Sequence, residues 1–222
     1  YGSISMVTFV TAATFLKAHD ATYAGYIVAI LALMEAPAIL SGLFIAHRAS
    51  PKTRTHAKEE KKLAREIFTN GAILLLFGSF LIGWATGQQG MDKMEGFLVT
   101  PFQGILALFL LDMGLMVSKN LHHLRHFTWP LGLFGIYMPL IGAGVGLGIS
   151  YLIGLDVGTG TLFTVLCASA SYIAVPAAMR LALPEAKAAI YLPMSLAITF
   201  PFNVVLGIPL YYALASTILL TN

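Results

Sequence analysis

Charged residues and cysteines are both scarce in this chain of 222 residues. Only 10% of the residues are charged, against about a quarter in a typical soluble domain. Hydrophobic residues make up 58% of the chain, and the mean hydropathy is +0.81. The single cysteine, Cys167, excludes an internal disulfide, and we expect it to be a small packing residue. This composition predicts an integral protein of the lipid bilayer and gives no indication of a nucleic-acid partner.

Long apolar runs alternate with short polar connections, and each run is compared with the roughly 20 residues that cross a bilayer as a helix. The sequence predicts six full spans, at Ala21–Ala46, Ile67–Thr86, Pro101–Ser118, Trp129–Ile153, Thr159–Leu183 and Ala188–Leu220, and one partial span at Tyr1–Leu16. Because the partial span is too short to cross alone and no charged leader precedes it, we expect N-terminal helices to be missing from this chain.

Basic residues gather in alternate loops, which predicts the orientation of the chain in the membrane. Eleven of the 13 Lys and Arg residues lie in three loops on one side, seven of them within Arg48–Glu66. Lys17 and Lys93 are the two exceptions. Since Lys and Arg are retained on the cytoplasmic side, we expect Arg48–Glu66 to be cytoplasmic and the C-terminus to lie outside.

Two serine motifs, Gly2-Ser3-Ile4-Ser5 and Ala168-Ser169-Ala170-Ser171, lie at or within apolar runs. The predicted orientation makes the two runs antiparallel. Unpaired polar groups are costly in hydrocarbon, so motifs of this kind persist mainly where they line a cavity. Antiparallel copies are typical of inverted-repeat transporters, in which half-helix ends hold anions and cations. A simpler interpretation stays open, in which each hydroxyl bonds a carbonyl one turn back.

Prolines follow both motifs at similar distances. Ser5 precedes Pro37 by 32 residues, and Ser171 precedes Pro201 by 30. A further proline, Pro176, follows Ser171 by five residues. We predict helix breaks at these three prolines, which would free backbone groups for ligands.

Alternate glycines occupy one apolar run, at Gly142, Gly144, Gly146 and Gly148. A phosphate-binding glycine motif needs a preceding strand, which is not expected here. Small residues four apart instead predict close packing of two helices.

These residues resemble the sodium-dependent bicarbonate transporters first recognised in cyanobacteria. Tyr1–Ser5 with Thr8 is similar to that family's Phe-Gly-Ala-Val-Ser…Thr segment, and Met34–Pro37 to its Met-Asp-Ile-Pro. Further positions in register with the family are Ser169, Ser171, Ile173, Pro176, Arg180, Pro184, Tyr191, Ser195, Pro201, the Met113-Gly114 pair and the Leu124-Arg125 pair.

The resemblance implies an all-α polytopic membrane protein, with an inverted five-plus-five helix repeat and broken crossover helices. Residues 1–47 would then be the end of the first repeat, residues 48–66 a basic cytoplasmic loop, and residues 67–222 the second repeat with its broken helix near 169–176. It also implies a homotrimer in the plasma (inner) membrane and a cytoplasmic regulator of the PII type.

The resemblance implies a binding site for sodium and a small anion at the two motifs. Oxygen ligands suit a hard cation, so Ser5, Thr8 and Ser171 are the expected sodium ligands. Tyr172 stands where the family has an aspartate. We expect the residues that bind ion or substrate to be Ser3, Ser5, Thr8, Ser169, Ser171 and Tyr172.

Two carboxylates, Glu35 and Asp112, lie well inside predicted spans. An ionisable group at that depth is costly, which makes a functional role the default interpretation. Each is a candidate sodium ligand or proton carrier, or else a protonated acid bonded to nearby backbone.

The function predicted from these features is secondary active transport, with sodium as coupling ion and a small inorganic or organic anion such as bicarbonate as substrate. One alternative is a cation–proton antiporter that uses Glu35 or Asp112. Another is a membrane sensor or scaffold that binds an ion without moving it. An enzyme is not expected, because no catalytic triad, metal cluster or phosphate cradle is present in the sequence.

Overall fold

A computed structural model describes residues 4–31, 33–34, 37–38, 71–102, 104–105, 107–108, 111–112, 115, 118, 129–172, 191 and 193–220. Every regular element within these ranges is a helix, which confirms the all-α prediction. The principal helices are α1 (Met6–Ala18), α4 (Gly71–Leu98), α6 (Trp129–Leu152), α7 (Val157–Ala168) and α11 (Ile208–Ile218). Three short elements precede α11, namely η3 (Met194–Thr199), α10 (Phe200–Phe202) and η4 (Asn203–Gly207).

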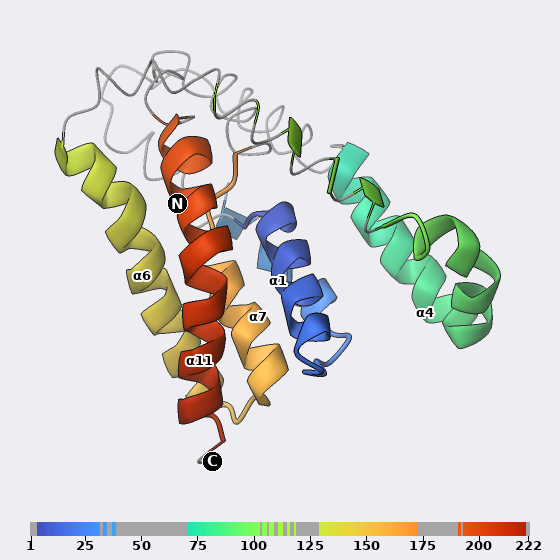
Figure 1. Cartoon of the computed structure of the whole chain (residues 1–222). Coiled ribbons are helices and arrows are strands. Elements are labelled where there is room, and N and C mark those ends of the chain that lie inside the picture. The colour runs from blue at the N-terminus through green and yellow to red at the C-terminus, as the bar shows by residue number, and fades with distance from the viewer. Residues whose placement is uncertain are drawn as a thin grey trace, which may run out of the picture.

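The helices α1, α6, α7 and α11 form one bundle, and α4 stands apart from it (Figure 1). Helix α7 is the centre of the bundle, since it contacts α1, α6 and α11. Its burial follows from its composition, because Val157–Ala168 contains no charged side chain and four small or hydroxyl residues in its first five positions. Helix α7 is therefore the core helix of the bundle. Helix α4, in contrast, leaves large apolar side chains such as Trp84 and Phe97 exposed.

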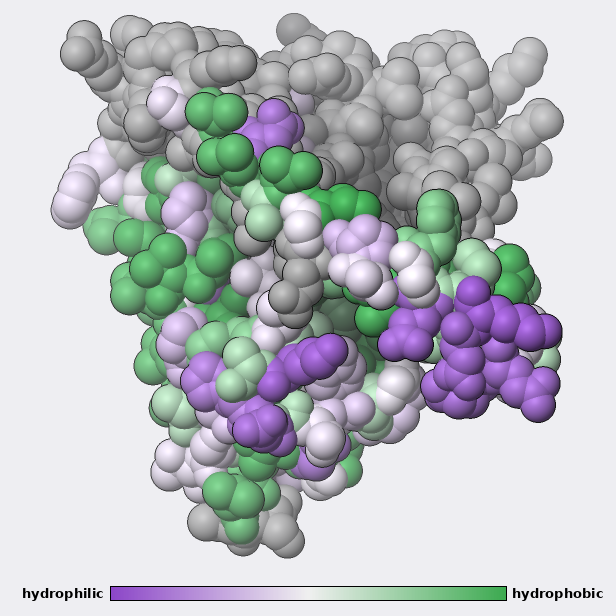
Figure 2. All heavy atoms as spheres, turned by 45° about the vertical axis from the view of Figure 1, so that its right-hand side comes forward, coloured by the Kyte–Doolittle hydropathy of each residue, from purple (hydrophilic) through white to green (hydrophobic). Residues whose placement is uncertain are grey.

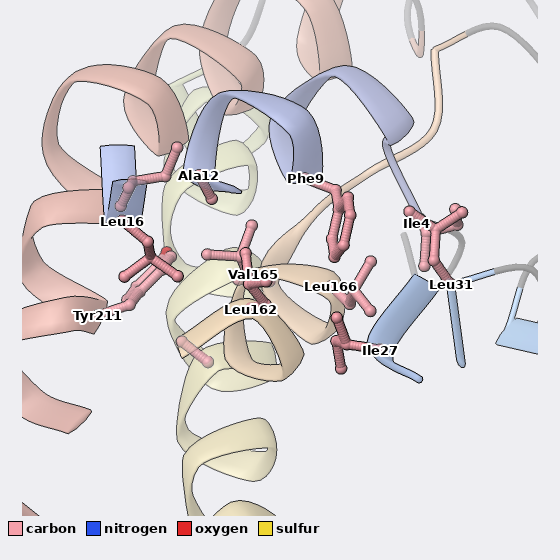
Figure 3. Packing of buried hydrophobic residues seen from close by; sticks show 13 residues of the cluster. Ile4, Phe9, Ala12, Leu16, Ile27, Leu31, Leu162, Val165, Leu166 and Tyr211 are labelled. Atoms are coloured by element: carbon pink, nitrogen blue, oxygen red, sulfur yellow. The ribbon is translucent and has the colours of Figure 1, made fainter. Parts of the chain in front are cut away.

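Apolar side chains of α1 and α7 interdigitate to form the main core (Figure 3). Phe9, Ala12 and Leu16 follow one face of α1 at spacings of three and four residues, and all three are buried. They meet the buried side chains of α7, together with Ile27, Leu31 and Tyr211. The α7 members of this core are Leu162, Val165 and Leu166.

Helices α1 and α7 run antiparallel. The Thr159 hydroxyl, in the first turn of α7, accepts a hydrogen bond from the Ala24 backbone N–H at 2.8 Å, beyond the C-terminal end of α1. A Cβ placed on Gly158 would collide with the Thr22 carbonyl, so the chain also passes very close to the start of α7. At the other end, the Ser5 N–H donates to the Ser169 hydroxyl. Each helix thus begins beside the end of the other.

Glycines allow α6 to lie directly against α7. A Cβ on Gly142 would collide with the carbonyl of Cys167, and one on Gly146 would lie 2.9 Å from both Thr164 Cα and Cys167 Cβ. Gly144 and Gly148 have nothing within 4 Å of the same position. The packing prediction therefore holds for the pair that faces α7, and Cys167 lies within that contact.

Helix α4 differs from the predicted span at Ile67–Thr86. It continues to Leu98, with a kink at Gly87, where φ is 56° and ψ is −150°. This conformation is readily adopted only by glycine. The residues after the kink are more polar, and the Gln88 amide donates to Asp92 at 2.8 Å. The apolar run thus ends at the kink, and a polar helix follows it.

The last helix is continuous from Met194 to Ile218, so the predicted break at Pro201 is wrong. The helix widens into π-turns on both sides of the proline instead. A proline lacks the N–H that would close an α-helical turn, and wider turns are a common way to accommodate such a defect. Pro37 and Ala38 are helical, but residues 35–36, which directly precede them, lie outside the described residues, so the break at Pro37 stays a prediction.

Two described helices, Trp129–Leu152 and Met194–Ile218, are long and apolar enough to cross a membrane. Helices α1 and α7 are shorter apolar helices. The 13 residues of α1 extend about 20 Å, less than the roughly 30 Å of a bilayer's hydrocarbon core. In Figure 2 hydrophobic residues cover much of the visible face, and hydrophilic residues gather toward its lower part. These features are those of a membrane protein.

Candidate functional site

The two serine motifs meet where α1 begins and α7 ends. The Ser5 backbone N–H donates to Ser169 Oγ at 2.9 Å, and the Ser169 hydroxyl donates to the Leu166 carbonyl at 2.9 Å. Both serines are extended in backbone conformation and buried. The structure thus brings together two predicted site residues that lie 164 positions apart in the chain. We call this junction the crossing.

Ser5 is the N-cap of α1. Its Oγ accepts from the Thr8 N–H at 3.2 Å and from the Thr8 hydroxyl at 2.9 Å. Capping fixes one of the amides that a helix start leaves without an intrahelical partner. No hydrogen bond from the first two amides of α1, at Met6 and Val7, is described. The crossing therefore receives the partial positive charge of α1 and, from the opposite side, the partial negative charge of the α7 C-terminus.

Asn203 stabilises the α7 end of the crossing, and the sequence analysis did not identify it. Its side-chain amide donates to the Ala168 carbonyl at 2.9 Å, and its Oδ1 accepts from the Tyr211 hydroxyl at 2.9 Å. Asn203 is 1% exposed. An amide within an apolar span is costly unless it is paired, and that signal was available in the sequence.

Tyr172 lies beside the start of α1. Its ring packs edge-on against Phe200 at a centroid distance of 5.3 Å, in a cluster with Leu196 and Val7. Its hydroxyl is buried and has no hydrogen-bond partner within the described residues. The hydroxyl lies near the Ser5 side chain but forms no hydrogen bond with it.

The buried polar side chains are all neutral in the part of the chain that the structure describes. They are Ser5, Thr8, Ser150, Thr159, Thr161, Thr164, Ser169, Ser195, Thr199 and Asn203. Among the same residues, no group of three or more His, Cys, Asp or Glu side chains could hold a metal. A cation at the crossing would therefore depend on hydroxyl and carbonyl oxygens, which are ligands that a hard cation accepts.

The remaining predicted site residues are placed as follows. Ser171 is adjacent to the crossing and partly buried. Asp112 is helical and exposed, and no contact between it and the crossing is described. Pro37 is exposed, and Pro201 lies in α10. The predictions for Ser3, Glu35 and Pro176 fall outside the described residues.

Replacing Ser169 with alanine is expected to lower the free energy of unfolding by about 1–3 kcal/mol, because the buried Ser5 N–H loses its acceptor. Thermal unfolding in detergent measures the effect. Ser216→Ala is the matched control, since its hydroxyl bonds only the Tyr212 carbonyl of the same helix, and we expect it to stay within about 0.5 kcal/mol of the parent. Equal stability of the two variants would contradict the contact between the motifs.

The comparison with protein families agrees with the resemblance seen in the sequence. No curated protein matches the chain. A family model described as the Na+-dependent bicarbonate transporter superfamily matches residues 1–216, which is nearly the whole chain. The chain therefore belongs to the Na+-dependent bicarbonate transporter superfamily.

Proposed function

We propose that the protein is a sodium-coupled symporter of a small anion such as bicarbonate, and that ion and anion bind at the crossing. The observation that carries this proposal is the meeting of the α1 N-terminus with the α7 C-terminus through Ser5 and Ser169. The first end attracts an anion and the second a cation. Both ends lie within a buried region without a charged side chain among the described residues.

Charge balance favours coupling of the two ligands. An anion removed from water into such a region needs a compensating charge, since burying an isolated ion is costly. The helix ends supply only partial charges, each equivalent to about half an elementary charge. A sodium ion bound beside the anion would supply the remainder, so binding of each would favour the other.

The proposed sodium ligands are oxygens of Ser5, Thr8 and Ser171. Ser5 and Thr8 are buried at the crossing, and their hydroxyls contact each other. Ser171 follows the α7 end by three residues. Thr8 Oγ1 donates to Ser5 Oγ and keeps its own lone pairs for a cation, whereas Ser5 Oγ accepts twice and would have to release the Thr8 hydroxyl to bind sodium.

The arrangement of the helices supports a division into a moving core and a scaffold. The bundle around α7 contains the crossing, whereas α4 stands apart from it (Figure 1). We propose that α1 and α7 are the half-helices of two inverted repeats, and that the core moves against a scaffold that includes α4. The antiparallel packing of α1, which begins at the crossing, and α7, which ends there, supports this assignment.

The proposed setting is a homotrimer in the plasma membrane, with Arg48–Glu66 in the cytoplasm, the C-terminus outside and a regulator of the PII type. The distribution of Lys and Arg supports the orientation. In Figure 1 the C-terminal ends of α1 and α4 and the start of α7 lie toward the same end of the molecule, and the predicted outer residues Lys17, Asp92 and Asp156 lie in or next to these ends.

The test is uptake into proteoliposomes that contain the full-length protein. We expect an inward sodium gradient to drive accumulation of labelled bicarbonate, and addition of the anion to accelerate sodium entry. Sodium movement that follows only a pH gradient would instead indicate the antiporter, and saturable binding without accumulation would indicate a sensor. Either result would overturn symport.

Replacing Thr8 with valine is expected to raise the sodium concentration for half-maximal uptake by about tenfold or more, a size typical of damage to a metal site. The change keeps the shape of the side chain and removes its hydroxyl. Thr161→Val is the matched control, because Thr161 is also buried but bonds only the Val157 carbonyl of its own helix. An unchanged sodium dependence in Thr8→Val would remove Thr8 from the proposed ligands.

A further inference from the structure

The hydrogen-bonding groups at the crossing are unevenly used. Ser5 Oγ accepts twice from Thr8, which uses both of its lone pairs, and Ser169 Oγ accepts from the Ser5 N–H. The Ala168 carbonyl, at the end of α7, accepts from Asn203. The lone pairs of Thr8 Oγ1, which donates to Ser5, are the ones proposed above to bind sodium.

Donors, in contrast, remain available. No hydrogen bond is described for the Met6 and Val7 amides at the start of α1, a helix of 13 residues. The Tyr172 hydroxyl is a second and independent donor without a partner within the described residues. Tyr172 is only 8% exposed, its side chain packs in one cluster with Val7 of α1, and its hydroxyl lies near Ser5, the N-cap of that helix. A buried hydroxyl without a partner costs free energy, which a bound acceptor would recover.

The position of the Tyr172 hydroxyl is fixed by packing. The ring contacts Phe200 edge-on, and Leu196, Val7 and Val204 complete the surrounding apolar cluster. A side chain held in this way donates without losing further rotamer freedom, so the donor is preorganised for a ligand.

We propose that Tyr172 is a specificity-determining residue that donates its phenolic hydroxyl to the transported anion beside the N-terminus of α1. The site thereby favours small monovalent oxyanions whose oxygens only accept hydrogen bonds, such as formate or nitrate. Bicarbonate carries an O–H of its own, which needs an acceptor, but Ser5 Oγ already accepts twice and the Thr8 hydroxyl oxygen is a proposed sodium ligand, so bicarbonate would compete with the sodium site for lone pairs. This inference rests on the proposed function, since it assumes that the anion binds at the crossing.

The test compares the parent protein with Tyr172→Phe in proteoliposomes with an inward sodium gradient. Labelled formate is the transported probe, and unlabelled nitrate and bicarbonate are competitors. We expect formate to be taken up, nitrate to compete better than bicarbonate, and Tyr172→Phe to raise the KM for formate by about tenfold, the loss of one hydrogen bond to a charged group. The preference for nitrate over bicarbonate is expected to shrink in the variant.

Thermal unfolding separates this role from a structural one. Phenylalanine keeps the ring that packs on Phe200 and removes only an unpartnered hydroxyl. Without anion, the variant is therefore expected to be as stable as the parent or more stable. Tyr191→Phe is the matched control, because Tyr191 has the other buried tyrosine hydroxyl without a described partner, and we expect it to leave the KM for formate unchanged.

The outcomes distinguish failure of this inference from failure of the proposed function. Sodium-driven uptake with the same KM and the same anion preference in both proteins would overturn the role of Tyr172 and leave symport standing. If no anion is transported, symport fails, and stabilisation of the protein by sodium formate then decides the inference. Equal stabilisation of parent and Tyr172→Phe would overturn it, and weaker stabilisation of the variant would support it.

Discussion

Replacing Gly142 with alanine is expected to lower the free energy of unfolding by about 1–3 kcal/mol, the usual cost of overpacking a filled core. The new methyl group would collide with the backbone carbonyl of Cys167, and backbone cannot rotate away as a flexible side chain can. Helix α6 would then have to move away from α7, the helix that ends at the crossing. Thermal or denaturant unfolding in detergent measures the loss, and uptake is expected to fall with it.

Gly144→Ala is the matched control. It lies on the same helix two residues away, and a Cβ there would have nothing within 4 Å. Alanine is the better helix former, so this variant is expected to be neutral or more stable by up to about 1 kcal/mol. Equal destabilisation by the two substitutions would show that the loss reflects the glycine itself and not contact with α7.

Hydropathy predicted the helices well because membrane spans depend on a property of single residues summed over a window. The predicted span Trp129–Ile153 corresponds to α6, which ends at Leu152. Local backbone geometry was harder to predict. The kink at Gly87 and the π-turns around Pro201 depend on how each freed backbone group finds a new partner, and a single sequence does not contain that information.

The contact between the serine motifs was predictable because two independent signals agreed. Charge in the loops made the two runs antiparallel, and the similar spacing to a proline paired Ser5 with Ser171. In the structure Ser5 bonds Ser169, and this contact is a different relation from equivalence between repeats, which stays a prediction. A hydrogen bond depends on where α7 ends, which the repeat pattern does not specify. Asn203 was visible in the sequence as an amide within an apolar span, but its partners were not, because one is the backbone carbonyl of Ala168 and nothing in the sequence links the other, Tyr211, to it.

Asn203 joins the crossing to the last helix, and its replacement by leucine is expected to lower the free energy of unfolding by about 2–4 kcal/mol. The substitution leaves two buried groups without their described partner, the Ala168 carbonyl and the Tyr211 hydroxyl. Each orphaned polar group costs about 1–3 kcal/mol. Leucine keeps the branched shape of asparagine and suits an apolar span, but it is larger, so the loss contains no cavity and combines the lost hydrogen bonds with some overpacking. Sodium-driven uptake is expected to fall as well, because Ala168 is the last residue of α7.

Tyr211→Phe tests the same network from its other side. This change removes one hydroxyl and leaves the Asn203 amide on the Ala168 carbonyl, so the expected loss is about 1 kcal/mol. In the Asn203→Leu background, Tyr211→Phe is expected to recover stability, because the orphaned hydroxyl is then absent and only one polar group lacks its partner. The sign of its effect thus reverses between the two backgrounds, which is the signature of direct coupling in a double-mutant cycle. Additive losses would mean that Asn203 and Tyr211 act independently, and the link between the last helix and the crossing would have to be abandoned.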